Sequence, residues 1–522
     1  MPAPNPQASA HAATATSVRP EDIPEVCAAL RASFDGGVPQ RRDWRLAQLR
    51  ALDRLLVEGR GELCEGMLRD LHKSKFEGYM QEIALVRQEV FDAIAHLDGW
   101  MADEAVGTNL FNVPARSVVR PDPLGVVLVL GAWNYNVLLS LQPLVGALAA
   151  GNCVVVKPGS YSVGSGAAMS RLIARYLDPA CVRCVEGNRH VTTALLGQRW
   201  DMIFFTGSPH VGRMVAEAAA KQLCPVVLEL GGKSPLVVDK SADLPTAARR
   251  AAWGALLNSG QTCVRPDYML VHEAVADAFL KLLVASIKQF YGAAPQRSEW
   301  YGRMVNDAAF RRMARCVEDG RARIVHGGEL DAAARFVAPT VFDFGADQLA
   351  FEASELMQDE VFGPLIPVLR YKDNAQALAL IRARPKPLAM YVFATDGAVA
   401  EAFLRHTSSG GAVVNDCIVH LSNDQLPFGG VGEAGMGSYH GKRSFDAFSH
   451  QKAVLFRTPY LDVPIRYPPY TAAKQRVLSA AFNPALGHYF AKLTGFASDG
   501  KNLVIGALLA ANVAQLARCS KL

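Results

Sequence analysis

The sequence lacks the features by which several large classes of protein are recognised. Its 522 residues contain no cluster of lysine and arginine and no basic stripe interleaved with aromatic side chains, and the net charge of +5 is small for this length. These absences argue against a nucleic-acid partner. No segment recurs at a fixed period either, which argues against a repeat architecture.

Cysteine is present, but without a disulfide pattern. The ten cysteines follow no regular spacing, which predicts free thiols in a reducing compartment rather than a secreted, disulfide-linked fold. One close pair, Cys181 and Cys184, has the C-x-x-C spacing found in some zinc sites. No second pair accompanies it, so we interpret the spacing as coincidental and expect no metal site.

The two ends of the chain are where signals that direct a protein to a cell compartment commonly lie. Residues 1–20 lack the apolar core of a secretory signal and the repeated arginines of a transit peptide, so we expect a disordered lead-in. The last three residues, Ser520-Lys521-Leu522, are the peroxisomal address S-K-L. They predict a location in the peroxisome, or in the glycosome where an organism has one, and a peroxisomal import receptor as partner.

No apolar run is long enough to indicate a membrane span. The segment Leu503–Ala517 is the candidate, but it is short and is interrupted by Asn512 and Gln515. Two interpretations stay open: an amphipathic helix that packs on protein, and a helix that contacts a membrane surface.

The rest of the chain has the composition of a soluble globular protein with more than one domain, since half its residues are hydrophobic and a fifth are charged. Apolar residues at three- and four-residue spacing predict helices from Glu21 to about Trp100. Short apolar runs then alternate with segments that can be helical, which predicts a doubly wound α/β sheet. The runs lie at residues 123–135, 152–160 and 201–208. A second series, which starts at 225–239, predicts a second α/β domain.

Polar residues follow several of these runs, where ligands bind in a doubly wound sheet. Gly207 and Ser208 come after one run and before a predicted helix, a place where backbone N–H groups attract phosphate. Gly207 and Gly212 have the spacing G-x-x-x-x-G rather than G-x-G-x-x-G, so a plain tight turn stays open. Lys157 ends another run and points to the ligand crevice, the alternative being an exposed loop lysine.

Two further residues have the chemistry of a catalytic site. Glu229 ends an apolar run, where burial would raise its pKa and suit it to act as a general base; a structural salt bridge is the alternative. Asn134 follows another run, and its amide could donate a hydrogen bond to a developing oxyanion.

The stretch "NSGQTCVRP" places Cys263 in a small, polar, glycine-containing segment. A cysteine there is either a nucleophile or one more buried thiol, because free cysteine often behaves as a small hydrophobic residue. The neighbouring Gly260 and Thr262 are small enough to leave room for a substrate beside the sulfur.

Together these segments resemble one family, the aldehyde dehydrogenases, and within it the dimeric class-3 type that includes fatty aldehyde dehydrogenases. The resemblance extends from about Pro24 to Pro469. Six motifs carry it in the family's order: "PLGVVLVLGAWNY", "FFTGSPHVG", "LELGGKSP", "NSGQTCVRPDY", "MQDEVFGP" and "LPFGGVGEAGMGSYHGKRSFDAFSHQ".

The resemblance implies a role for each candidate residue. It makes Cys263 the nucleophile, Glu229 the general base, and Asn134, with the backbone N–H of Cys263, the oxyanion hole. It assigns the other residues to NAD or NADP: Lys157 and Glu360 to the riboses, Gly207, Ser208 and Gly212 to the pyrophosphate turn, and Phe362 to the nicotinamide.

The resemblance also implies the fold. It is an aldehyde dehydrogenase-like α/β fold with a Rossmann-type cofactor domain, an α/β catalytic domain and a small β oligomerisation element. The expected parts are the lead-in at 1–20, the cofactor domain at 21–107 and 123–228, the catalytic domain at 229–424, the oligomerisation element at 108–122 and 425–462, and a C-terminal extension at 463–522.

The implied activity is NAD(P)-dependent oxidation of an aldehyde to a carboxylic acid through a cysteine thiohemiacetal and thioester. A medium- or long-chain aliphatic or an aromatic aldehyde is the expected substrate, in lipid metabolism, and a homodimer is the expected assembly. Two alternatives stay open: an acylating enzyme that passes the thioester to coenzyme A, and a catalytically silent binding protein. Glu229 argues against the first, and the complete set Asn134, Glu229 and Cys263 argues against the second.

Three positions depart from the family's pattern. Asn136 stands where the family usually has proline, which alters the loop beneath the oxyanion amide. Ser160 replaces a glutamate that holds the adenine ribose, so we expect NADP to be accepted at least as readily as in members that keep the glutamate. Arg265 stands where alanine is common; it either lowers the thiol pKa of Cys263 or faces solvent.

Overall fold

The computed structural model describes residues 18–109, 112, 114–460, 462 and 464–481. The chain divides into two compact units, which are described separately. One comprises Met1–Leu97 with Pro123–Phe448, and the other Asp98–Asp122 with Ser449–Leu522.

The larger unit begins with the predicted helices, which are confirmed. They are α1 (Ile23–Asp35), α2 (Arg42–Glu58), α3 (Arg60–Leu71), α4 (Lys75–Gly78) and α5 (Ala84–Met101). The apolar spacing explains them: in α2, the side chains of Leu49, Leu52, Leu55 and Leu56 lie on one face and are fully buried.

A six-stranded sheet forms the first α/β layer of this unit, with the order β17-β7-β6-β3-β4-β5. Its strands are β3 (Val126–Leu130), β4 (Cys153–Lys157), β5 (Val182–Cys184), β6 (Met202–Thr206), β7 (Val226–Glu229) and β17 (Gly435–Met436). All neighbouring strands are parallel except β17, which pairs antiparallel with β7. Every residue of β3, β4 and β6 is buried, which is why these segments are continuously apolar.

The order of the strands creates a topological switch point in this sheet. The chain runs outward from β3 through β4 to β5, and it resumes on the other side of β3 with β6 and β7. The connecting helices are α6 (Asn136–Ala150), α7 (Val163–Tyr176), α8 (Arg189–Leu196) and α9 (Pro209–Ala220). The direction reverses between β3 and β6, and ligands bind outside the carboxyl ends of strands at such a point.

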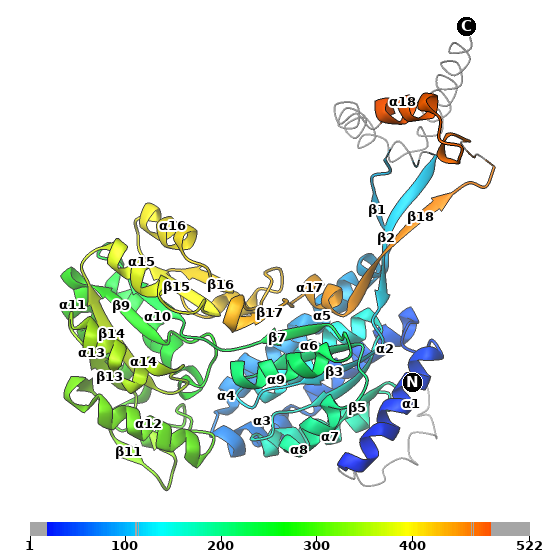
Figure 1. The fold of residues 1–522 in the computed structure, drawn as a ribbon. Coiled ribbons are helices and arrows are strands. Elements are labelled where there is room, and N and C mark those ends of the chain that lie inside the picture. Colours follow the sequence, from blue (N-terminus) through cyan, green and yellow to red (C-terminus); the bar gives the residue numbers. More distant parts are fainter. Residues whose placement is uncertain (1–17, 110–111, 113, 461, 463, 482–522) are drawn as a thin grey trace. The chain divides into compact units, whose positions relative to one another are not determined.

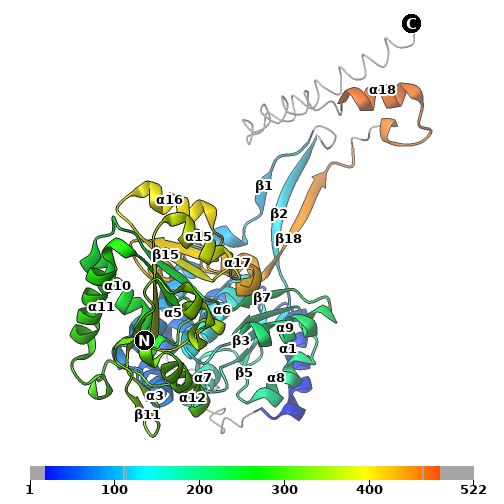
Figure 2. The same ribbon diagram turned by 60° about the vertical axis from the view of Figure 1, so that its left-hand side comes forward.

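A seven-stranded sheet with the order β10-β13-β14-β9-β8-β15-β16 forms the second α/β layer (Figures 1 and 2). Its strands are β8 (Pro235–Val238), β9 (Tyr268–His272), β10 (Ile324–His326), β13 (Thr340–Asp343), β14 (Leu365–Tyr371), β15 (Ala389–Phe393) and β16 (Gly411–Val414). Only β10 is antiparallel to its neighbour. The associated helices are α10 (Leu244–Leu256), α11 (Ala276–Tyr291), α12 (Asp307–Asp319), α13 (Gln348–Ala353), α14 (Glu355–Gln358), α15 (Asn374–Arg382) and α16 (Gly397–His406); a short hairpin, β11 (Leu330–Asp331) and β12 (Phe336–Val337), completes this layer. Helix α17 (Lys442–Ala447) packs against α6 of the first layer instead.

The expectation that the second series of strands begins at residue 225 is wrong by one strand. Strand β7 pairs with β6 in the first sheet, and the second sheet begins with β8. The physical reason is that Gly231 and Gly232 separate two apolar runs of similar composition, and only long-range pairing decides which sheet each run joins.

The smaller unit contains a three-stranded sheet with the order β1-β2-β18. Its strands are β1 (Glu104–Val106), β2 (Ala115–Pro123) and β18 (Ser449–Arg457), and β1 is antiparallel to β2. Arg120 of β2 donates to both carboxylate oxygens of Asp103, at 2.7 and 2.8 Å, which ties β2 to the start of β1.

Helix α18 (Ala472–Ala481) is the last described element. The apolar segment Leu503–Ala517, the address Ser520-Lys521-Leu522 and most of the lead-in at 1–20 lie outside the described residues. Among the helices that are described, none combines the length and the hydropathy needed to cross a bilayer.

Candidate active site

The predicted site residues of the first sheet meet at its carboxyl edge. Lys157 is the last residue of β4 and Glu229 is the last residue of β7. Gly207 and Ser208 follow β6, and Asn134 lies between β3 and α6. The sheet therefore brings together residues that are far apart in the sequence, on both sides of the switch point.

Asn134 is held from three directions. Its side-chain amide donates to the backbone carbonyl of Gln261 at 3.1 Å, two residues before Cys263. Its own carbonyl accepts from Nζ of Lys73 at 3.0 Å and from Nδ2 of Asn258 at 2.9 Å. An amide nitrogen has two N–H groups, so the second can donate to an oxyanion beside the Cys263 loop.

A buried ion pair that the sequence did not reveal supports Asn134. Nζ of Lys73 lies 2.5 Å from Oε1 of Glu82, and both side chains are fully buried. The other oxygen of Glu82 accepts from the N–H groups of Val137 and Leu138 in the first turn of α6, at 2.8 and 3.2 Å. The carboxylate therefore stabilises the positive end of α6, just after Asn134.

The segment before Cys263 has an unusual backbone. Asn258, Ser259 and Gly260 all have positive φ angles, of 52°, 53° and 72°. A Cβ atom on Gly260 would lie 2.2 Å from the carbonyl oxygen of Gly363, so this turn is pressed against the segment after Phe362. Left-handed residues of this kind, other than glycine, often occur at functional sites.

The expectation that Gly260 and Thr262 leave room for a substrate is wrong. Backbone of Gly363 fills the space at Gly260. Thr262 is buried, and its hydroxyl shares a hydrogen bond of 2.6 Å with the hydroxyl of Tyr135. Both small residues therefore serve close packing of the loop that carries Cys263.

Cys263 is half-buried and lies near two carboxyl groups. Burial, followed by the charges of Glu360 and Glu229, raises the pKa of its thiol to about 12. Two carboxyl groups from separate segments thus lie within electrostatic reach of one sulfur, an arrangement that a structural thiol in an apolar core does not have.

Glu229 is buried, and neither of its carboxylate oxygens forms a hydrogen bond with any described residue. The alternative of a structural salt bridge is therefore wrong for the part of the chain that the structure describes. Burial raises the pKa of Glu229 well above its usual range, because the ionised form loses its hydration and gains no partner. The group is thus suited to exchange a proton with a water or thiol that comes beside it.

Neither interpretation of Arg265 holds. Its side chain is buried, so it does not face solvent. It donates to the carbonyls of Ala255 and Leu365, at 3.1 and 2.8 Å, and forms an ion pair with Asp267 at 3.4 Å. The charges that shift the thiol pKa of Cys263 are those of Glu360 and Glu229, and they raise it. Arg265 therefore joins the end of α10 to the start of β14, because its long side chain turns inward.

Asp267 links three of the six motifs, a role that the sequence did not reveal. One of its carboxylate oxygens lies 2.5 Å from Nζ of Lys233, in the motif of Glu229. The other accepts from the backbone N–H of Val361, between Glu360 and Phe362, at 2.8 Å. No usable signal for this role was present in the sequence, because nothing in the local pattern distinguishes Asp267 and Lys233 from surface residues.

Glu360 and Phe362 lie in the segment that faces this loop. A Cβ atom on Gly231 would lie 2.1 Å from Oε2 of Glu360, so the carboxyl group rests on the Gly231 backbone just after Glu229. Its Oε1 atom is buried and has no hydrogen bond with a described residue. Phe362 has a φ of 47°, and its ring contacts Trp133 edge-on with centroids 5.4 Å apart.

Lys157 is buried rather than exposed in a loop, which removes one alternative. Its Nζ donates to the hydroxyl of Ser160 at 2.6 Å, and that hydroxyl donates to the carbonyl of Gly187 at 3.0 Å. Burial lowers the pKa of Lys157 to about 8, and among the described residues no carboxylate forms an ion pair with it. A buried ammonium with only a hydroxyl partner fits a ligand that carries hydroxyl or phosphate groups.

The turn after β6 also fits a phosphate-bearing ligand. Ser208 is the N-cap of α9, and its hydroxyl accepts from the N–H of Val211 at 3.4 Å. A Cβ atom on Gly212 would lie 2.6 Å from Leu230, so this glycine allows α9 to pack closely. The predicted contacts of Gly207, Ser208 and Gly212 with pyrophosphate stay predictions.

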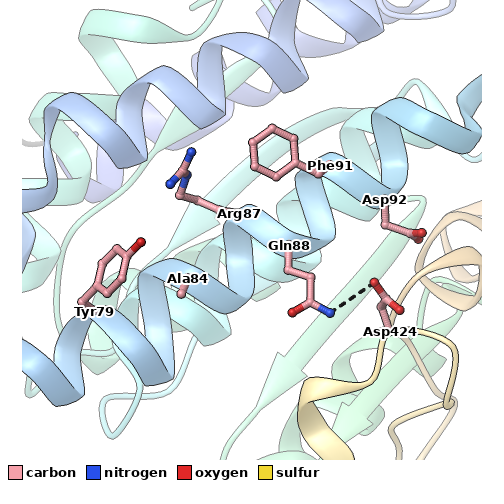
Figure 3. Close-up of a pocket in the computed structure, with 7 residues that line it drawn as sticks. All are labelled: Tyr79, Ala84, Arg87, Gln88, Phe91, Asp92 and Asp424. Atoms are coloured by element: carbon pink, nitrogen blue, oxygen red, sulfur yellow. Dashed lines mark hydrogen bonds between the residues drawn. The ribbon is translucent and has the colours of Figure 1, made fainter.

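A cavity of about 410 Å³ lies elsewhere on this unit, along α5 (Figure 3). It is lined by Tyr79, Ala84, Arg87, Gln88, Phe91, Asp92 and Asp424. One hydrogen bond joins two of these residues: Nε2 of Gln88 donates to the carboxylate of Asp424 at 3.3 Å. None of the predicted catalytic or cofactor-binding residues lines it. Among the described residues, no group of histidine, cysteine or acidic side chains is arranged to hold a metal ion.

Known proteins provide an independent comparison. The model of the aldehyde dehydrogenase family matches residues 1–454. Aldehyde dehydrogenase family 3 member H1 of Arabidopsis thaliana is 44% identical over 474 residues, which are 90% of this chain and 96% of the relative. Family 3 member B1 of Homo sapiens is 43% identical over 454 residues, which are 87% and 96% of the two chains. The substrate-bound structure of Staphylococcus aureus AldH superposes with a TM-score of 0.85 at 36% identity, covering 88% of this chain and 99% of its own.

Proposed function

The chain belongs to the aldehyde dehydrogenase family, and we propose that it oxidises medium- or long-chain aliphatic or aromatic aldehydes to carboxylic acids. It is an NAD(P)-dependent enzyme with an aldehyde dehydrogenase fold. The observation that carries the proposed mechanism is the pair formed by Cys263 and Glu229. The carboxyl group is buried, lacks a hydrogen-bond partner among the described residues, and lies within electrostatic reach of the thiol.

The first step forms a bond between the sulfur of Cys263 and the carbonyl carbon of the aldehyde. The thiol gives its proton to Glu229, which releases it to solvent before the hydrolytic step, and the negative charge passes to the substrate oxygen. The side-chain amide of Asn134 and the backbone N–H of Cys263 donate hydrogen bonds to that oxygen. Because Asn134 is fixed to Gln261 and Lys73, its amide needs little rearrangement when the charge develops.

In the second step the carbon of the thiohemiacetal loses a hydride and the oxygen–carbon bond becomes the thioester carbonyl; NAD or NADP, when bound, would supply the hydride acceptor. Lys157, Ser160, Glu360 and the turn at Ser208 would hold the dinucleotide. Water, with its proton taken by Glu229, then attacks the thioester carbon. The carbon–sulfur bond breaks, the carboxylic acid leaves, and Glu229 returns the proton to the sulfur, which restores the thiol of Cys263.

The two alternatives predict different behaviour. In an acylating enzyme, coenzyme A would attack the thioester and a hydrolytic base would be unnecessary, so a buried, unpartnered Glu229 favours hydrolysis. A silent binding protein would not need Asn134, Glu229 and Cys263 at one site.

The proposal is tested by the formation of reduced nicotinamide over a series of aldehydes of increasing chain length, with each cofactor. Activity that rises with chain length supports a fatty aldehyde enzyme in lipid metabolism. Folded protein with a reactive Cys263 thiol but no activity toward any aldehyde would contradict the proposal, and a requirement for coenzyme A would support the acylating alternative.

For the cofactor, we propose that NADP is accepted at least as readily as in relatives that have a glutamate in place of Ser160. The 2′-phosphate of NADP would lie near a buried lysine with no carboxylate beside it, because Ser160 contributes only a hydroxyl to Lys157. We expect Ser160→Glu to weaken NADP binding about tenfold relative to NAD, since the new charge repels the phosphate and pairs with Lys157. The measurement is the dissociation constant of each dinucleotide.

Ser160→Gln is the matched control, because glutamine has the size of glutamate without its charge. A glutamine variant that lost NADP affinity as strongly as the glutamate variant would indicate a steric effect. A wild-type protein with a strong NAD preference that Ser160→Glu does not change would contradict the charge argument.

We propose a peroxisomal or glycosomal location, on the basis of Ser520-Lys521-Leu522 alone. Deletion of these three residues is expected to leave an N-terminally tagged fluorescent fusion in the cytosol, with turnover unchanged. One residue added after Leu522 should have the same effect, because the import receptor reads the address only at the extreme end. Import of either variant would contradict the proposed address.

We also propose a homodimer that forms through the three-stranded sheet of the smaller unit. Strand β18 is at one side of that sheet, and its Leu455 and Phe456 are exposed, which suits an interface between copies. Sedimentation equilibrium should give twice the chain mass of 56.3 kDa. Contact of the segment after Pro469 with a membrane surface stays a proposal, which flotation of full-length and truncated protein with liposomes would test.

A further inference from the structure

Asn136, the residue that stands in place of the family's proline, joins two loops at the carboxyl edge of the first sheet. It is the first residue of α6, and only 2% of it is exposed. Its Nδ2 donates to the carbonyl of Ser162 at 3.1 Å and to the hydroxyl of Ser165 at 2.9 Å. Its Oδ1 accepts from the N–H of Gly159 at 2.7 Å. One side chain thus bonds to three residues of the segment that follows β4.

The two loops are in close contact because residue 159 is glycine. A Cβ atom on Gly159 would lie 2.5 Å from the backbone nitrogen of Trp133 and 2.6 Å from its Cα, distances that no real side chain tolerates. The hydroxyl of Ser162 donates to the carbonyl of Trp133 at 2.6 Å. The loop after Lys157 therefore lies directly on the residue that precedes Asn134.

The start of α7, which Asn136 contacts through Ser165, is itself held by a residue of another helix. The carboxylate of Asp70, in α3, accepts from the N–H of Gly164 at 2.7 Å and from the N–H and hydroxyl of Ser165 at 2.8 and 2.7 Å. Because the hydroxyl of Ser165 donates to Asp70, its lone pairs remain for Nδ2 of Asn136. The start of α7 is thus fixed, and Asn136 transmits that fixed position to Gly159, between Lys157 and Ser160.

We infer that Asn136 is a positioning residue for the dinucleotide: it holds the loop from Lys157 to Ser160 in its binding position before the cofactor arrives. The inference rests on the proposed function, in which Lys157 and Ser160 help to hold the dinucleotide. Lys157, Pro158 and Gly159 are buried, but Ser160 itself is exposed, so this last residue gains little from burial and depends on hydrogen bonds for its order. A loop that is already ordered does not lose conformational entropy when the ligand binds. Proline at position 136 has no amide side chain with which to hold the loop.

The test compares Asn136→Pro and Asn136→Ala with the wild-type enzyme. Proline is favoured at the first position of a helix, where the N–H has no partner within the helix, so α6 should still form. We expect the dissociation constant and the KM of NADP and NAD to rise about tenfold in both variants, and kcat at saturating cofactor to change less than about twofold. The rate at which Cys263 is alkylated in the absence of cofactor should not change.

Asn152→Ala is the matched control. Asn152 is fully buried and also makes three hydrogen bonds between segments, with Gly125 at 2.8 Å, Ala147 at 3.2 Å and Phe448 at 3.0 Å. Asn152 directly precedes β4 and lies at the amino end of that strand, whereas Lys157 lies at its carboxyl end. We expect its loss to lower the melting temperature and to leave the dinucleotide KM unchanged, which separates positioning from general stability.

Gly159→Ala tests the same contact from the other side. The added methyl group must push the loop away from Trp133, so we expect a higher dinucleotide KM here too. The inference is overturned if the Asn136 variants lose stability as Asn152→Ala does while they bind the dinucleotide like the wild type, or if only kcat falls. A wild-type protein that binds the dinucleotide but oxidises no aldehyde would refute the proposed function alone, since the binding comparison would still apply. A wild-type protein that binds neither dinucleotide would overturn both.

Discussion

Replacement of Cys263 by alanine is expected to lower aldehyde oxidation by about 10⁴-fold or more, because no other side chain at the site can form the thiohemiacetal. The fold should remain, since a half-buried sulfur is small and the loop is held by other residues. Thr262 bonds to Tyr135, and Asn258 and Gln261 bond to each other and to Asn134. Dinucleotide affinity should therefore stay near that of the wild type. The measurements are steady-state turnover, melting temperature and dinucleotide binding.

The matched control is Cys27→Ala. Cys27 is also a half-buried free cysteine, but it lies in α1, and burial raises the pKa of its thiol to about 11. Its loss should not affect turnover. Alkylation by iodoacetamide should inactivate the wild type and Cys27→Ala at the same rate. Turnover that survives in Cys263→Ala would show that Cys263 is one of the structural thiols and that the proposed mechanism is wrong.

The second large effect is expected for Glu229→Gln, in which the thioester forms but is hydrolysed slowly. Loss of a general base lowers the rate of the step that it serves by about 10²- to 10⁴-fold. The variant should therefore release about one equivalent of reduced nicotinamide per site in a rapid burst and then turn over slowly. Mass spectrometry of the quenched enzyme should detect the acyl group on Cys263.

The pH dependence of this step provides a second readout. Burial raises the pKa of Glu229, so at low pH the carboxyl group keeps its proton and cannot accept one from water. Hydrolysis by the wild type should accelerate as the pH rises and the carboxylate forms. Glutamine has no such proton to lose, so the slow hydrolysis in the variant should not show that rise.

Glu89→Gln is the control for removal of a buried carboxylate elsewhere. Burial raises the pKa of Glu89 to about 7, and its Oε1 accepts from Ser444 and Gly441 at 2.8 Å. This variant should show no burst and no acyl adduct. Full steady-state activity of Glu229→Gln would contradict the assignment of the base, and rapid release of the acyl group by coenzyme A alone would favour the acylating alternative.

Local patterns were enough to predict the elements that carry the site. Continuous apolar runs identified the central strands β3, β4 and β6, because strands buried on both faces contain almost nothing else. Asn134, Lys157 and Glu229 each follow or end such a run, and in the structure all three lie at the carboxyl ends of strands of the first sheet. Periodicity predicted the helices of the first hundred residues in the same way.

The hydrogen-bond partners of buried polar side chains could not be predicted from local sequence patterns. Arg265 was expected to approach the thiol or face solvent, but it turns inward to carbonyls of Ala255 and Leu365, the second of them 100 residues away in the sequence. Nothing in the local sequence marked Lys73 or Asp267, and both are buried. A sequence shows that a side chain can donate or accept; it does not show which distant group comes within hydrogen-bond distance.

By itself, the sequence determined the type of chemistry. The kinds of residue at the ends of the apolar runs, a cysteine in a small polar turn and six motifs in order are local properties, and folding does not change them. The tertiary structure decided the state of those groups. Only the packing of separate segments leaves Glu229 without a partner, places its charge and that of Glu360 near Cys263, and presses Gly159 against Trp133 so that Asn136 can join two loops. The physical reason is that burial, hydrogen-bond partners and pKa depend on what surrounds a group in space, and most of those neighbours are distant in sequence.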